Sequence, residues 1–214
     1  MIKIVSEIFA DIGYILLFIN CILLGKNICR KTKPVKVFLI YNLVMLLVQM
    51  ISKVLFTLKM NNLFLSHFYF IFQFLILSYF YYILLDVPFQ KRVVKIVSAI
   101  TLLVLCIVYA WKPELFFSLN LLEIFVTSLP VVIYAAFHLY NLLNKQHYFY
   151  YTTVGILIYL YGSTFLFLSY ELIMIAIEKE AGVYTWFLNI FLYVVYQLFI
   201  LKDLLKTKRY ENRN

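Results

Sequence analysis

Apolar residues run along this chain in seven long stretches that are separated by short polar segments. Each stretch holds roughly 19 to 28 residues, and about 20 are enough for a helix to cross the hydrocarbon layer of a bilayer. The pattern therefore predicts an all-α, polytopic membrane protein, with consecutive helices antiparallel because their connections are short. The predicted transmembrane helices cover residues 4–25, 37–58, 63–85, 93–111, 119–143, 150–177 and 183–205.

Composition supports the membrane class and limits the domain organisation. The chain is 65% hydrophobic and 14% charged, with a mean hydropathy of +0.93, whereas soluble domains are about 25% charged. The seven stretches leave few residues over, so we expect one seven-helix domain at 1–205 and a basic tail at 206–214. The three cysteines show no CxxC spacing, which predicts neither a disulfide framework nor a zinc site.

Basic residues are distributed unequally between the two predicted sides of the membrane. Fourteen of the 19 Lys and Arg residues lie on one side, chiefly in 26–36, 91–95 and 202–213. Because cytoplasmic loops carry the excess of Lys and Arg, the N-terminus is expected outside and the C-terminus in the cytoplasm of a bacterial inner membrane. The net charge of +9 is then explained by anionic lipid headgroups as partners, and no nucleic acid partner is expected.

Polar residues inside the predicted helices are the best indication of a site, because such groups are costly in a bilayer and usually face the bundle interior. In the fifth stretch Asn120, Glu123 and Thr127 recur every three or four residues and so share one helix face. The ionisable residues concentrate towards the outer half, which predicts a polar vestibule open to the outside. The candidate ligand-binding residues are Asp11, Lys53, His67, Gln73, Glu123 and Asn189.

The chain contains no recognisable catalytic motif. The spacing of its histidines matches no HExxH or HxxxH pattern, so no metal site is expected. No cofactor motif appears, and no catalytic residue is assigned. The remaining acid and base candidates, for an intramembrane enzyme that modifies lipids, are Asp11, Glu123 and His67.

Two weak internal similarities suggest a duplication. Residues 7–9 recur as residues 123–125, and residues 79–86 resemble residues 196–203. Two three-helix units, 1–86 and 119–205, joined by the fourth stretch would produce both offsets. That 3+1+3 layout resembles the SWEET and PnuC type of carrier, which implies transport of a small solute, although the first stretch lacks the proline of their signature.

The whole chain also resembles a class of small bacterial seven-span proteins with no established activity. The similar segments are FLSHFYFIFQFLILSYFYYILL at 64–85 and YTTVGILIYLYGSTFLFL at 151–168. This resemblance implies the seven-helix fold and no particular chemistry. From the sidedness of the polar residues we expect a membrane sensor or receptor that binds a small ligand and signals to a cytoplasmic partner or within a homo-oligomer. A small-solute transporter is the alternative, and a lipid-modifying enzyme is a further one.

Overall fold

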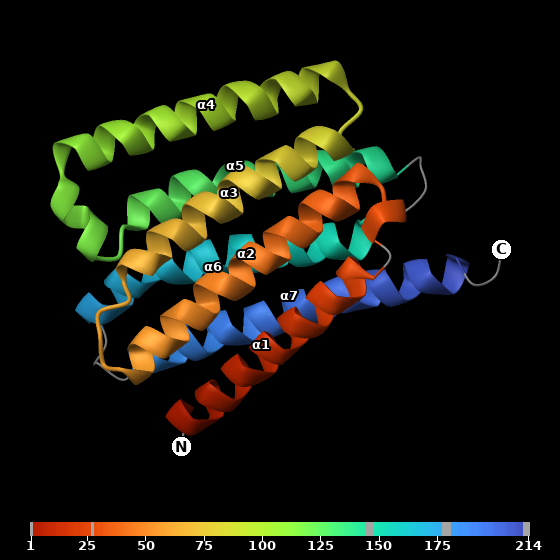
Figure 1. Cartoon of the computed structure of the whole chain (residues 1–214). Coiled ribbons are helices and arrows are strands. Elements are labelled where there is room, and N and C mark those ends of the chain that lie inside the picture. Colours follow the sequence, from red (N-terminus) through yellow and green to blue (C-terminus); the bar gives the residue numbers. More distant parts are fainter. Residues whose placement is uncertain (1, 27, 144–147, 177–180, 212–214) are drawn as a thin grey trace. The chain divides into compact units, whose positions relative to one another are not determined.

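Seven α-helices make up nearly all of the described chain (Figure 1). The structure, a computed structural model, describes residues 2–26, 28–143, 148–176 and 181–211, and this part contains no β-strand. Two short 3₁₀ helices, η1 (Ile28–Arg30) and η2 (Pro113–Phe117), lie in connections. The α-helices are α1 (Ile2–Gly25), α2 (Lys33–Thr57), α3 (Phe64–Leu84), α4 (Pro88–Trp111), α5 (Leu121–Leu142), α6 (Tyr150–Ala176) and α7 (Ala181–Glu211).

Each of these seven helices includes a segment long and apolar enough to cross a membrane. The predicted all-α class and the seven spans are therefore confirmed, and the helices suggest a multi-pass membrane protein. Two helices begin at least four residues earlier than predicted, α2 at Lys33 and α4 at Pro88. Both carry a proline in their first turn, a position that needs no intrahelical N–H donor. At the other end of the chain, α7 continues to Glu211, so that much of the predicted tail is helical.

The chain divides into two compact units, one of residues 1–26 and 139–214 and one of residues 27–138. This division differs from the proposed repeat halves, 1–86 and 119–205. One seven-helix domain and a 3+1+3 duplication stay predictions.

In the unit that contains α1, α6 and α7, helix α7 packs against both of the others. Small residues allow close approach of the helices: a Cβ at Gly155 would lie 2.8 Å from the Cβ of Phe199, and one at Gly13 would lie 2.9 Å from the Tyr193 ring. A polar contact adds to this packing, because the Asn20 amide on α1 donates to the side chain and the backbone carbonyl of Gln197, both at 3.0 Å.

In the unit of residues 27–138, α3 packs against α2 and α4. Helix α5 contains Pro130, which has no N–H to donate to the carbonyl of Val126 four residues earlier. The hydroxyl of Thr101 on α4 donates to that carbonyl oxygen at 3.5 Å. A side chain from the neighbouring helix thus replaces the missing backbone hydrogen bond, as is common where proline lies in a membrane helix.

Candidate functional site

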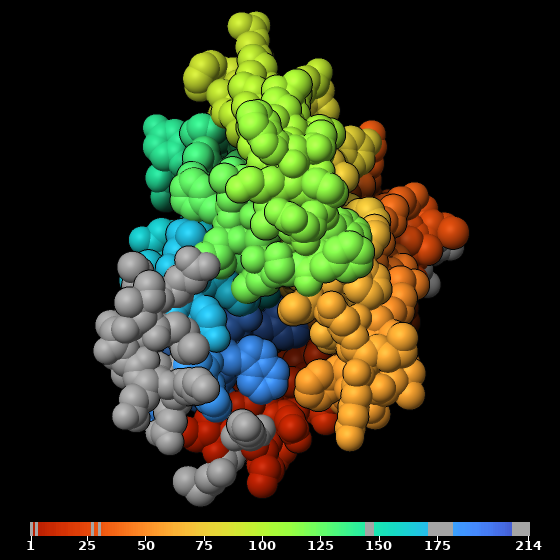
Figure 2. Space-filling view, turned by 90° about the vertical axis from the view of Figure 1, so that its left-hand side faces the viewer, coloured from red at the N-terminus to blue at the C-terminus, as the bar shows by residue number. Residues whose placement is uncertain are grey.

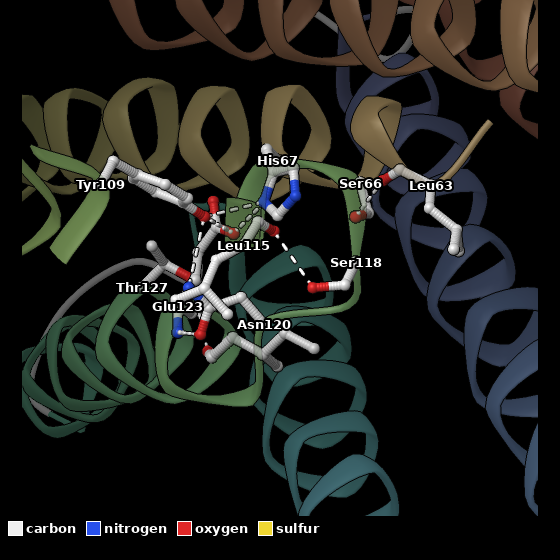
Figure 3. Close-up of polar contacts among 10 residues, drawn as sticks. Leu63, Ser66, His67, Tyr109, Leu115, Ser118, Asn120, Glu123 and Thr127 are labelled. Carbon is white, nitrogen blue, oxygen red and sulfur yellow. Dashed lines mark hydrogen bonds and ion pairs between the residues drawn. The ribbon is translucent and has the colours of Figure 1, made fainter. Parts of the chain in front are cut away.

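Four polar side chains meet at one end of the unit of residues 27–138, and we call them the His67 cluster: His67, Tyr109, Asn120 and Glu123 (Figure 3). His67 lies in the first turn of α3, Tyr109 in the last turn of α4, and Glu123 in the first turn of α5. These helix ends lie on the same side of the unit because α3, α4 and α5 alternate in direction (Figure 1).

Asn120 directs the start of α5. Its side-chain oxygen accepts the backbone N–H of Glu123 at 3.3 Å, which is the contact of an N-cap residue with the third helical position. In a capping box the glutamate at that position turns back to the cap, but here its carboxylate points to α3 and α4 (Figure 3). The positive end of the helix dipole also favours a carboxylate in this turn.

The Glu123 carboxylate is the acceptor at the centre of the cluster. The Tyr109 hydroxyl donates to Glu123 Oε2 at 2.6 Å, and His67 Nδ1 contacts the same oxygen. His67 Nδ1 also lies 2.8 Å from the Tyr109 hydroxyl oxygen, and that oxygen accepts the Asn120 amide N–H at 3.4 Å. A single carboxylate oxygen therefore joins three helices.

Aromatic rings cover the cluster on the side of η2. The Phe116 ring stacks on the His67 imidazole with centroids 5.0 Å apart, and its edge contacts both Phe68 and Tyr109. In the view onto this end of the helices, the green atoms, which run from the last part of α4 through η2 to the start of α5, form one contiguous patch (Figure 2). The side chains of His67 and Glu123 are each only 1% exposed.

Each member of the central pair keeps one polar atom that is not engaged. Among the buried atoms of the described residues, His67 Nε2 and Glu123 Oε1 have no hydrogen-bond partner. An unsatisfied buried polar group costs about 1–3 kcal/mol, and more when it is charged. These two atoms of the pair are therefore available to a ligand.

The structure brings together two of the six predicted ligand-binding residues, His67 and Glu123. Gln73 is buried further along α3, where its side-chain oxygen accepts the Tyr41 hydroxyl at 3.4 Å. Lys53 on α2 is exposed. Asp11, which is exposed, and Asn189, which is half-buried, belong to the other unit.

Two members of this site were not predicted from the sequence, Tyr109 and Phe116. Tyr109 is the continuation of a buried stripe on α4 that includes Thr101 and Leu105, and the four-residue spacing of these positions was an available signal. Phe116 lies in a connection, where no periodicity marks the inward side.

We expect Tyr109→Phe to lower the free energy of unfolding by about 1.5 kcal/mol, because it removes the hydrogen bond from the Tyr109 hydroxyl to the buried Glu123 side chain. Thermal unfolding in detergent micelles measures the loss. Tyr79→Phe is the matched control, since Tyr79 is 45% exposed and the change keeps the ring over which the Lys33 ammonium lies. Equal melting temperatures for the two variants would contradict the expectation.

The described residues contain no group of three or more His, Cys, Asp or Glu side chains that could hold a metal ion. Comparisons with known proteins identify no relative, because no protein-family model, curated protein or solved structure matches this chain. Evidence for a function therefore comes from the contacts and burial of the His67 cluster.

Proposed function

We propose that the chain is a receptor-like membrane protein in which the His67 cluster is the centre of a small-ligand site. The observation that carries this proposal is the contact of a buried imidazole with a buried carboxylate, each with one unengaged polar atom. Ionisable groups inside a membrane protein are retained mainly where they bind or transfer something. Roles for Asp11, Lys53, Gln73 and Asn189 in ligand binding remain part of the proposal.

The direction of signalling follows from the charge distribution. The His67 cluster lies at the end of its unit where α2 and α4 terminate, while Lys33, Lys36, Lys91 and Lys95 lie at the opposite end. With the positive end in the cytoplasm, the cluster faces the outer side of the bacterial inner membrane. The basic end would then meet anionic lipid and a cytoplasmic partner or a second copy of the chain.

A ligand screen by thermal shift in detergent tests the proposal. We expect at least one class of small molecule to stabilise the wild type. It should stabilise Glu123→Gln and His67→Gln much less, because each variant replaces one of the two ionisable side chains of the pair. Glu114→Gln is the control, since Glu114 is an exposed acid on η2 at the same end. Stabilisation that is equal in all four proteins, or absent from all, would refute a binding site for a small molecule other than the proton at the cluster.

An intramembrane enzyme is a second candidate, favoured by the same contact. A carboxylate that contacts a histidine orients it and raises its basicity, which is the arrangement of a general base. Turnover of a lipid substrate in reconstituted bilayers, lost in His67→Gln, would replace the receptor function by this one. Solute uptake into proteoliposomes would instead support the 3+1+3 carrier.

A further inference from the structure

We propose that the His67–Glu123 pair is a hydrogen-ion-binding site, and that the proton is the ligand of the receptor site proposed above. The identification of the proton as a ligand rests on the proposed receptor function, whereas the hydrogen-ion site itself does not. It follows from how many protons the hydrogen bonds of the cluster require, from the charge that each protonation state leaves in a buried place, and from the segment that touches the imidazole.

The first proton of the pair is needed by the contacts themselves. An amide nitrogen can only donate, so Asn120 donates to the Tyr109 hydroxyl oxygen, and the single hydroxyl proton goes to Glu123 Oε2. The contact between His67 Nδ1 and Glu123 Oε2 then needs a proton of its own. It belongs to either the imidazole or the carboxyl group, and in both cases the pair holds one proton between these two atoms.

A second proton has two places to bind, and both are unengaged. His67 Nε2 and Glu123 Oε1 are buried without a hydrogen-bond partner in the described structure. With one proton, the pair is a neutral imidazole beside a carboxylate and carries one negative charge. With two protons it carries no net charge, either as an imidazolium–carboxylate pair or as two neutral groups.

Burial makes the difference between these states large. Both side chains are 1% exposed, and an uncompensated charge inside a membrane protein is costly. Uptake of the second proton removes that charge, whereas its release creates it and favours access of water to the site. A proton is also the ligand that needs the least room, and a larger molecule would require the layer formed by η2 to move.

The other titratable and charged groups around His67 do not supply a compensating buried charge. Tyr109 on α4 donates a hydrogen bond to the Glu123 carboxylate. Glu123 itself is the titratable group that α5 places beside His67. Nearby on η2, on α2 and at the end of α4, Glu114, Lys53 and Lys112 have exposed side chains. The pair is thus the buried titrating unit at this end of the described residues 28–138.

A change in the protonation of His67 acts directly on η2. The Phe116 ring lies parallel to the imidazole, with an interplanar angle of 21°, and an aromatic face attracts a cation more strongly than a neutral ring. The imidazolium therefore holds Phe116 more firmly than the imidazole does. Because η2 is largely exposed, other molecules can contact it. A shift of η2 is therefore how proton binding is transmitted to a neighbouring molecule.

Proton uptake by the purified full chain in detergent micelles tests the inference. Over the pH range in which the protein stays folded, we expect the wild type to take up one proton per chain more than His67→Gln. Glu123→Gln should likewise lose this uptake, because its amide neither titrates nor holds the imidazolium as an ion pair. The matched control is His138→Gln, which removes a second buried histidine of the same unit. This variant should still take up the proton that the His67–Glu123 pair binds.

A spectroscopic measurement on the wild type guards against misfolding of the variants. With ¹⁵N-labelled histidine, the His67 ring should show both of its protonation states across the same pH range. A His67 ring that keeps one protonation state throughout, together with equal proton uptake in wild type, His67→Gln and Glu123→Gln, would overturn the inference. The ligand screen would then be the remaining test of the receptor function.

A label at the residue that follows η2 tests signalling through η2 separately from proton binding. A spin label on Ser118→Cys, with the three native cysteines replaced by alanine, should change its mobility over the pH range of proton uptake, and Glu123→Gln should abolish the change. Proton uptake with an unchanged label would support the hydrogen-ion site and refute signalling through η2.

Discussion

Glu123→Ala is expected to cause the largest loss of stability, about 3–5 kcal/mol, because it leaves two groups at a buried site without their shared hydrogen-bond partner, each at a cost of about 1–3 kcal/mol. The change removes the acceptor of the Tyr109 hydroxyl and the partner of His67 Nδ1, and the His67 side chain that loses its partner is only 1% exposed. Glu123→Gln should lose less, because its amide oxygen still accepts a hydrogen bond. Thermal unfolding in one detergent, at a fixed pH, measures all the variants.

Glu114→Ala is the control for this comparison, since Glu114 is exposed and lies at the same end of the unit. Its loss should be within about 0.5 kcal/mol, as for other surface substitutions. If Glu123→Ala and Glu114→Ala unfolded at the same temperature, the hydrogen bonds that converge on Glu123 would contribute nothing to stability, and the cluster would lose its physical basis.

Gly155→Leu is expected to have the second largest effect, a loss of about 3 kcal/mol, at the upper end of the usual range for overpacking. A Cβ at this position would already lie 2.8 Å from the Cβ of Phe199 and 3.1 Å from the Tyr196 ring, and the Cβ of Phe199 cannot move without α7. The added side chain therefore has to separate α6 from α7. The melting temperature and the elution volume in size-exclusion chromatography report the change.

Gly25→Leu makes the same chemical change where there is space. Nothing lies within 4 Å of a Cβ at Gly25, in the last position of α1, so this variant should unfold close to the wild type. A Gly155→Leu protein as stable as Gly25→Leu would show that α6 and α7 do not approach each other as closely as described.

The fold class could be predicted from the sequence because the constraint on a membrane helix is simple. Apolar runs long enough to cross the bilayer located all seven helices, and their ends differ by a few residues where the helix continues past the apolar run. At α2 and α4 the additional residues include two basic side chains each, and the first-turn prolines Pro34 and Pro88 mark the true starts. The arrangement into two units depends on which side chains interlock, as Gly155 and Phe199 do, and hydropathy contains no such information.

The site was predictable only in part, for a similar reason. Glu123 and His67 stood out because ionisable residues are conspicuous in apolar stretches, and the structure places them in contact. That Asp11 and Asn189 belong to a different compact unit depends on tertiary packing that helix periodicity does not encode. Tyr109 was missed because a tyrosine near the end of a membrane helix is ordinarily an interfacial anchor, and only its partners on α5 give it another role.

Pro130 has a consequence for how α5 responds to events at Glu123. The proline interrupts the backbone hydrogen bonds seven residues after the carboxylate, and the substitute bond from Thr101 is long, at 3.5 Å. Bending stiffness is lowest where a helix lacks one of its own hydrogen bonds. The part of α5 before Pro130, which carries Glu123, is therefore joined to the rest of the helix at a flexible point. It can tilt by small amounts while the remainder of α5 keeps its place.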